Sequence, residues 1–361
     1  MIDFKPTDEQ QLVVDTVRSF AANEIRPRAR ECEEAKKLPD KVIEQAHELG
    51  LVANALPESA GGGGQRAAVT GALVAEELAW GDLSIALAIL SPSLTAFPIA
   101  EFGTGEQKQL LARFTASRFA PGSLAWVEPR FDFDPFRPAC TARRAGNGYR
   151  LDGRKCLVPW QVGADPLLVV ASEQGMPHAF LVSRDASGLG AEQEHNMGIQ
   201  ALPTAELTLE GVNVGADSRL GGQAGADLRR VLNQGRVGLA AMAVGVARAA
   251  FEVARDYARE RRVFGVPVAT KQAIAFKLAD MAIEIDGARL LVWEAAWTLD
   301  QGRDATREAL LARRQAQRVA LEVADGAVQV LGGHGYIRDY LPELHLRNAR
   351  GFASFEALTL V

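Results

Sequence analysis

The residue types that most often bind metals or carry redox chemistry are sparse in this sequence. Its three cysteines are Cys32, Cys140 and Cys156, and no two of them have the C-x-x-C spacing of a zinc or thioredoxin-like site. So small and odd a number also excludes the disulfide framework of a small secreted protein. We therefore predict no metal site and no fold held by disulfides.

Two other strings are of chemical interest but have more than one interpretation. Arg259–Arg262 is a run of four charged residues. A guanidinium can fork onto two phosphate oxygens, although by composition alone such a run is more often a solvated helix face. Gly332 and Gly333 follow an apolar stripe of helical period, so they fit a helix C-cap as well as a close backbone approach to a ligand.

A carboxylate with apolar neighbours lies near the last residue of the sequence. Glu356 follows Phe352 and Phe355 and precedes Leu358. A carboxylate removes protons from carbon effectively only where it is desolvated, and these neighbours are suited to desolvating it. The alternative is an exposed glutamate at a frayed chain end.

The composition excludes several classes of protein. The 361 residues are 48% hydrophobic and 24% charged, which argues for a large core and against intrinsic disorder. A net charge of −5 argues against a nucleic-acid partner. The polar start MIDFKPTDEQ has no signal-peptide core, and the longest apolar run, Val237–Ala247, is too short for a bilayer that needs about 20 residues. We expect a cytoplasmic protein without a membrane span.

The hydrophobic pattern divides the chain into three blocks. Residues 1–120 read as an N-terminal helical domain, in which Thr7 with Gln10 has the pattern of a capping box and Ala67–Phe102 reads as buried helices. Residues 121–222 read as a middle β domain of short strands separated by glycine turns. The predicted strands are Leu124–Val127, Tyr149–Val158, Leu167–Ala171, Ala179–Val182 and Ala205–Leu209.

Residues 223–361 return to a helical period. Two or three long antiparallel helices fit this block, with loops near Gly265–Pro267 and Gly302. The predicted fold class is therefore mainly α with a middle β domain.

Several short strings, in this order along the chain, resemble the flavin-dependent acyl-CoA dehydrogenase family. Each string alone is weak, but eight in order cover nearly the whole chain. They are Pro57-Glu58 with the glycines after it, Phe102–Lys108, Val127-Glu128-Pro129, Leu151–Lys155, Met197-Gly198, Glu260–Gly265, Gln272 and Gln329–Tyr336.

The resemblance implies an N-terminal helical domain, a β-barrel-like middle domain and a C-terminal four-helix-type bundle. It also implies FAD between the middle and C-terminal domains, in contact with a neighbouring subunit, and hence an oligomer. By this resemblance Arg261 pairs with the FAD pyrophosphate, and Gln329, Gly332 and Gly333 face its adenosine part. Further residues that the resemblance places at the cofactor are Phe264, Gln272, Val127, Val158 and Pro159.

The resemblance also implies a catalytic base. Arg347–Glu356 resembles the family string that ends in a glutamate, so Glu356 is expected to remove the α-proton of an acyl thioester while the β-hydride goes to flavin N5. The family's alternative base position corresponds to Gly235 here, which favours Glu356. Arg236 and Phe355 are expected at the substrate.

The sequence departs from the family on the flavin side. Val127 and Pro159 replace residues with hydroxyl groups near the flavin, and Arg130–Asp134 is bulky where the family has small residues. Glycine and threonine after the base are replaced by Ala357 and Leu358, and the sequence ends five residues after Glu356, where the family usually continues into another helix. Each lost hydrogen bond typically contributes about 0.5–1.5 kcal/mol, so FAD affinity is expected to fall.

Three functions remain open at this point. The first is an FAD-dependent acyl-CoA dehydrogenase in fatty-acid metabolism that passes electrons to an acceptor such as an electron-transfer flavoprotein. The second is a flavin-deficient partner subunit of a hetero-oligomeric dehydrogenase. The third is another acyl-thioester enzyme or binder on the same fold. The first is the prediction, as a homodimer or homotetramer.

Overall fold

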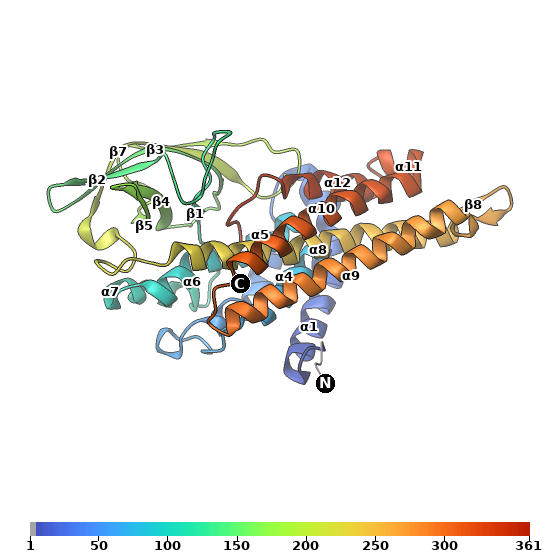
Figure 1. Cartoon of the computed structure of the whole chain (residues 1–361), viewed down its shortest axis with the longest axis horizontal. Coiled ribbons are helices and arrows are strands. Elements are labelled where there is room, and N and C mark those ends of the chain that lie inside the picture. Colours follow the sequence, from blue (N-terminus) through green and yellow to red (C-terminus); the bar gives the residue numbers. More distant parts are fainter. Residues whose placement is uncertain (1–4) are drawn as a thin grey trace.

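The structure is a computed structural model and describes residues 5–361, so the first four residues of the polar N-terminal stretch lie outside the description. Helical, β and helical blocks follow one another in the predicted order (Figure 1). The β domain lies at one end of an elongated molecule. A hairpin of the last block forms the tip of the other end.

The first block is a set of helices around a common apolar core. Their bounds are α1 (Asp8–Phe20), α2 (Ala29–Ala35), α3 (Asp40–Glu48), α4 (Ala68–Gly81), α5 (Leu83–Leu90), α6 (Ser93–Phe102) and α7 (Gly105–Lys108). The predicted capping box is confirmed, because Thr7 and Gln10 exchange side-chain to backbone hydrogen bonds at the start of α1. The helices predicted within Ala67–Phe102 are α4, α5 and α6, and they are buried on nearly every face.

The middle block is a seven-stranded mixed sheet in the order β1-β4-β2-β3-β7-β6, with β5 paired to β4. The strands are β1 (Leu124–Ala125), β2 (Thr141–Ala145), β3 (Gly148–Pro159), β4 (Leu167–Glu173), β5 (Met176–Val182), β6 (Leu189–Gln193) and β7 (Thr204–Gly215). The sequence pattern had not indicated β2 or β6. Both are largely exposed and polar, so cross-strand hydrogen bonds rather than an apolar stripe define them.

Strand β4 joins the two cores of the molecule. Leu167 and Val169 point into the core of the β domain, whereas Leu168 and Val170 belong to the helical core. Successive side chains of a strand face opposite sides, so this continuous apolar run buries both faces of the sheet at once. The β domain is thereby fixed against the helices that carry the candidate site.

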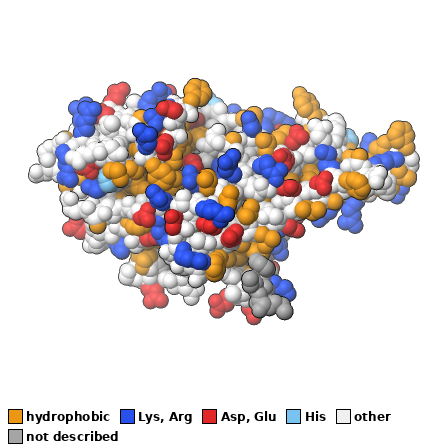
Figure 2. Space-filling view, viewed as in Figure 1, with side chains coloured by type: hydrophobic (Ala, Val, Ile, Leu, Met, Phe, Trp, Pro, Cys, Tyr) orange, Lys and Arg blue, Asp and Glu red, His pale blue; other side chains and the backbone are white. Residues whose placement is uncertain are grey.

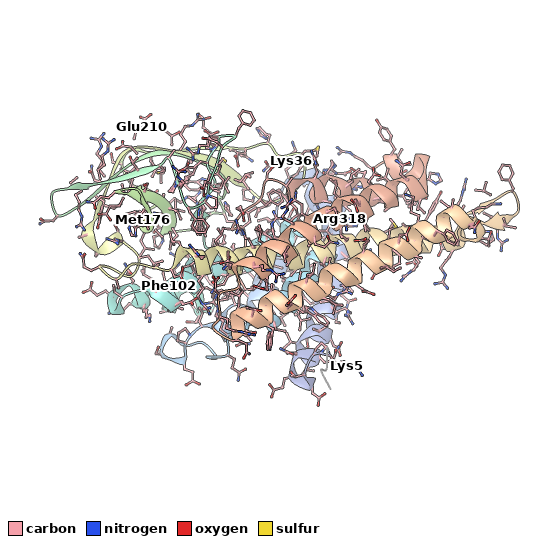
Figure 3. All side chains as sticks on the ribbon, viewed as in Figure 1. Lys5, Lys36, Phe102, Met176, Glu210 and Arg318 are labelled. Carbon is pink, nitrogen blue, oxygen red and sulfur yellow. The ribbon has the colours of Figure 1, made fainter. Side chains whose placement is uncertain are left out.

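The last block is built on three long antiparallel helices, α8 (Leu228–Glu260), α9 (Gln272–Asp300) and α10 (Thr306–Leu331), with the short α11 (Gly333–Tyr336) and α12 (Pro342–Gly351). Where a loop was predicted at Gly265–Pro267, the chain forms a two-stranded hairpin of β8 (Arg262–Val263) and β9 (Val266–Pro267). Arg318, labelled on α10 in Figure 3, pairs with Glu284 of α9 at 2.5 Å between Nη2 and Oε2.

Two helical stretches, Leu83–Phe102 and Leu228–Glu260, are long and apolar enough to cross a membrane by length and hydropathy. Their most apolar windows are 94% and 78% buried inside the protein. This burial is typical of the core helices of a globular protein. Both stretches are therefore apolar because they pack inside the protein, including the run Val237–Ala247 within α8.

Candidate active site

Glu356 lies just beyond the end of α12, in a turn that packs into the interior. The rings of Phe352 and Phe355 before it are buried and meet edge to face, with centroids 5.8 Å apart. The side chain of Glu356 is 22% exposed. The carboxylate is therefore largely shielded from water but still reaches the surface.

One oxygen of Glu356 is held by a cation and the other is free. Arg236 of α8 donates to Oε1 from Nε at 3.3 Å and from Nη2 at 3.2 Å. Oε2 is buried and has no hydrogen-bond partner among residues 5–361. An oriented carboxylate with an unoccupied oxygen can accept a proton from a bound molecule. The structure thus brings Arg236, Phe355 and Glu356 together.

A second cation, which the sequence analysis did not identify, secures the backbone before Glu356. Arg313 of α10 is buried and donates from Nη2 to the carbonyl oxygens of Phe352 and Phe355, the second at 2.8 Å. Burial lowers the pKa of Arg313 to about 10, the nearby Glu356 opposes this, and Arg236 adds to it. The only sequence signal was a charged residue on the apolar stripe of α10, which fits a helix surface equally well.

The residues expected beside the flavin ring are buried within the chain. Val127 follows β1, and Val158 and Pro159 end β3. Their backbone groups already have partners: the carbonyl of Val127 accepts the N–H of Cys156 at 2.9 Å, and the carbonyl of Pro159 accepts the Ser123 hydroxyl at 2.8 Å. Burial, with the nearby Glu194, raises the pKa of the Cys156 thiol to about 12, so that thiol is no nucleophile near neutral pH.

Bulky side chains of the β domain near Val127 and Pro159 pack against the helical core. Phe133, Phe136 and Leu157 are partly buried against it, and the guanidinium of Arg229 lies 5.7 Å from the ring centroid of Phe136. Leu157 lies at a break in the β3–β7 register with φ of 53°, and its N–H donates to both carboxylate oxygens of Glu194. The chain therefore supplies its own partners in this region.

Two of the motif residues form a buried ion pair. Lys155 is completely buried and donates from Nζ to Glu128 Oε1 at 2.9 Å, while the backbone N–H groups of Ala139 and Cys140 donate to the same carboxylate. Burial alone would raise the pKa of Glu128, but Lys155 and the two N–H groups hold that pKa below its usual range. These motif strings therefore contribute a structural pair rather than a reactive one.

The residues expected at the pyrophosphate lie at the opposite end of the molecule. Arg261 directly follows α8 and Gln272 begins α9, and both are exposed. Phe264, at the turn of the hairpin between them, is 94% exposed. In Figure 2, apolar and basic side chains lie together at this protruding tip.

The residues expected at the adenosine lie at the same end. Gln329 is exposed in the last turn of α10, and Gly332 follows with φ of 58° and ψ of −129°, a conformation that favours glycine. A Cβ atom added to Gly333 would meet nothing within 4 Å in the described part of the chain. The hydroxyl of Tyr257, near the end of α8, is 2.8 Å from Nδ1 of His334 in α11, which links the two groups of residues.

Comparison with known proteins agrees with this architecture. Family models described as the acyl-CoA dehydrogenase N-terminal domain and the acyl-CoA dehydrogenase C-terminal domain match residues 7–118 and 226–356. The chain is 36% identical over 360 residues to a probable acyl-CoA dehydrogenase, YngJ, of Bacillus subtilis, covering 97% of this chain and 94% of the relative.

The chain belongs to the acyl-CoA dehydrogenase family. It superimposes on the butyryl-CoA dehydrogenase of Megasphaera elsdenii with a TM-score of 0.89 and 31% identity, covering 98% of this chain and 96% of the other. It superimposes on a glutaryl-CoA dehydrogenase of Mycobacterium smegmatis in complex with FADH2 with a TM-score of 0.88 and 27% identity, covering 97% of this chain and 91% of the other. The family is one of oxidoreductases, and this relative supports FAD as the cofactor.

The two ends of the predicted cofactor site differ in how well they suit FAD. At the bundle end, an exposed guanidinium, two exposed amides and the open surface at Gly333 suit a phosphate-bearing ligand. At the β-domain end, Val127 and Pro159 are buried and carry no hydroxyl group. The bundle end therefore fits the phosphate-bearing part of FAD, whereas Val127, Val158 and Pro159, the residues expected at the flavin ring, are apolar and buried.

Proposed function

We propose that this protein is an FAD-dependent acyl-CoA dehydrogenase in which Glu356 removes the α-proton of the acyl thioester. One observation carries the proposal: Oε2 of Glu356 is buried and has no partner in the described part of the chain, while Oε1 is held by Arg236. A base prepared in this way need not break an existing hydrogen bond before it accepts a proton.

The chain's own residues supply the proton-transfer half of the reaction. Arg236 orients the carboxylate, Arg313 holds the turn that presents it, and the rings of Phe352 and Phe355 shield it from water. The α C–H bond breaks toward Oε2, and its electron pair becomes part of the α,β double bond. When bound, FAD supplies the acceptor for the hydride that leaves the β-carbon.

Within one copy of the chain, the predicted cofactor residues at the bundle end lie far from those at the β-domain end (Figure 1). This separation supports a homo-oligomer in which two copies share each FAD. Arg261, Phe264 and Gln272, with Gln329, Gly332 and Gly333, would hold the phosphate and adenosine parts of an FAD whose ring lies near Val127, Val158 and Pro159 of another copy.

Helix α9 supports such an association. It exposes a row of large apolar side chains seven residues apart, and such residues lie on one helix face. These are Phe276, Ile283, Leu290 and Trp297. An electron-transfer flavoprotein as acceptor, a role in fatty-acid metabolism and a cytoplasmic location belong to the same proposal.

The test is Glu356→Gln with Glu322→Gln as a matched control. Glu322 is an exposed glutamate on α10 that pairs only with Arg318 among its described contacts. We expect flavin content to stay the same in both variants, and reduction of the bound flavin by acyl-CoA to slow by about 10²–10⁴ in Glu356→Gln alone. Bleaching at the wild-type rate in Glu356→Gln would remove Glu356 as the base.

A second candidate is a flavin-deficient subunit that completes the site of a homologous partner. The packing of Phe133, Phe136 and Leu157 against the helical core and the burial of Pro159 favour it. Its test is the colour of the purified chain. A colourless protein that takes up no added FAD, but yields a coloured complex when co-expressed with a complete homologue, would support this candidate over the first.

A further inference from the structure

The residues immediately after Glu356 are buried in the helical interior. In the segment 357–361, Ala357 and Thr359 are completely buried and Leu358, Leu360 and Val361 are no more than 3% exposed. Ala357 has φ of 50°, an uncommon conformation for a residue with a Cβ atom. The chain turns sharply here, directly from the base into the core.

Glycines on two helices make room for this segment. A Cβ atom at Gly238 of α8 would lie 2.8 Å from Cγ2 of Thr359, and one at Gly71 of α4 would lie 3.0 Å from Cβ of Val361. Larger residues at these positions would collide with the segment unless it moved. Helices α4 and α8 therefore form a groove that segment 357–361 fills.

Hydrogen bonds hold the far half of the segment in this groove. The N–H of Leu360 donates to Oγ of Ser93 at the start of α6 at 3.1 Å. Arg66 Nη2 donates to the backbone oxygen of Val361 at 2.9 Å. The segment is thus attached to the start of α6 and to the loop that precedes α4.

A cavity of about 310 Å³ lies beyond the segment, and its walls include Leu360 and Val361. Its other apolar walls include Val52, Val74, Leu90 and Phe97. Transfer of an acyl chain from water into apolar surroundings is favourable. The groove next to Glu356 is filled by the segment, and Leu360 and Val361 are the residues of the segment that also line this cavity.

We propose that Leu360 and Val361 close the acyl path and restrict the enzyme to short acyl groups. This inference rests on the proposed function, because it takes the α-carbon of the substrate to lie at Glu356. An acyl group that extends from Glu356 toward the cavity must displace Leu360 and Val361 from a close-packed groove, and a longer chain must displace them further. The cavity beyond them would then become part of the acyl site only when these side chains are made smaller.

The test compares the Kd values of butyryl-CoA and octanoyl-CoA, measured by calorimetry on the full-length FAD-loaded protein. The wild type is expected to bind butyryl-CoA more tightly, and Leu360→Ala is expected to shift the ratio by about tenfold toward octanoyl-CoA. Val361→Ala is a smaller change expected to shift the ratio in the same direction, and it serves if Leu360→Ala fails to fold. Leu358→Ala is the matched control, since Leu358 is buried in the same segment but does not line the cavity.

Wild-type protein that binds octanoyl-CoA as tightly as butyryl-CoA would overturn the inference. So would a Kd ratio in Leu360→Ala and Val361→Ala that stays at the wild-type value. The Kd ratio measures binding and therefore tests this inference alone. The proposed function is tested separately: it fails if acyl-CoA still reduces the flavin of Glu356→Gln at the wild-type rate, whatever the Kd ratio is.

Discussion

The two ends of this molecule differ in whether their motif residues are buried or exposed. At the β-domain end, Val127 and Pro159 are buried, and the Lys155–Glu128 pair is closed off from water. At the bundle end, Arg261 and Gln329 are exposed, and the surface at Gly333 is open. The first end satisfies its groups internally, whereas the second presents groups suited to another molecule.

This difference shows where motif residues contribute to stability and where they are available for binding. A buried charge must have its partner within the fold, because water cannot replace that partner. An exposed charge contributes little to stability and is available to a ligand or a neighbouring copy. Substitutions at the two ends should therefore separate effects on unfolding from effects on cofactor binding.

The largest expected effect on stability is at the buried end. Lys155→Met should lower the free energy of unfolding by about 3–5 kcal/mol, because it leaves Glu128 buried without its closest cation. The matched change at the bundle end is Arg255→Ala, which removes the exposed pair with Asp256 and should cost less than about 1 kcal/mol. Urea unfolding at pH 7 measures both, and equal losses would contradict the contrast between the ends.

The same pair predicts a pH dependence. The pKa of Glu128 is lowered in the folded protein, so its stabilising effect is present above the unfolded pKa of about 4.3 and is lost as the pH falls through the folded value. In Lys155→Met, burial without this cation leaves the pKa of Glu128 higher than in the wild type, so the difference in stability between the two proteins should narrow as the pH falls from 7 through the acidic range. Urea titrations at several acidic pH values measure the free energy of unfolding of both proteins. A difference that does not change with pH would argue against the Lys155–Glu128 charge pair as its cause.

The next effect concerns cofactor binding at the exposed end. Hydrogen bonds to charged groups contribute about 1.5–3 kcal/mol, so Arg261→Ala should weaken FAD about 10- to 150-fold with little loss of stability. Arg259→Ala, two residues earlier and also exposed, is the control. Fluorescence titration of the apoprotein with FAD measures both, and an unchanged Kd in Arg261→Ala would exclude a pyrophosphate contact.

The smallest effect concerns a single hydroxyl group at the buried end. Pro159→Thr restores a donor that the family usually has, and should tighten FAD by about 2- to 10-fold if the ring lies beside it. Pro203→Thr, at a nearby proline before β7, controls for the general effect of the exchange. A folded Pro159→Thr protein with unchanged FAD affinity would mean that the ring does not reach this end, as the partner-subunit candidate expects.

Much of the fold was predictable because it depends on local patterns. The capping box at Thr7, the buried helices of Ala67–Phe102 and five of the strands follow from periods of 3.6 and 2 within short windows. Strands β2 and β6 were missed because pairing with neighbours defines them, and not burial of an apolar face.

The candidate site was predictable only in part. The motif strings indicated Glu356, Arg236 and Phe355, but no spacing in the sequence indicated Arg313 beneath the turn or the Lys155–Glu128 pair. Each of these contacts joins residues that are tens of positions apart. A charged side chain within an apolar stripe does not itself reveal which distant group it meets.

The sequence by itself determined the order of the helices and strands and the family to which the chain belongs, because apolar periodicity and motif order are properties of neighbouring residues. Only the tertiary structure decided that Arg236 holds one oxygen of a glutamate 120 positions away, while the other oxygen has no partner among residues 5–361. It also decided that segment 357–361 enters the groove between α4 and α8. The physical reason is that a groove exists only once two helices have packed. The sequence alone does not show that Gly71 and Gly238 leave room for this segment, because that depends on which residues pack against them.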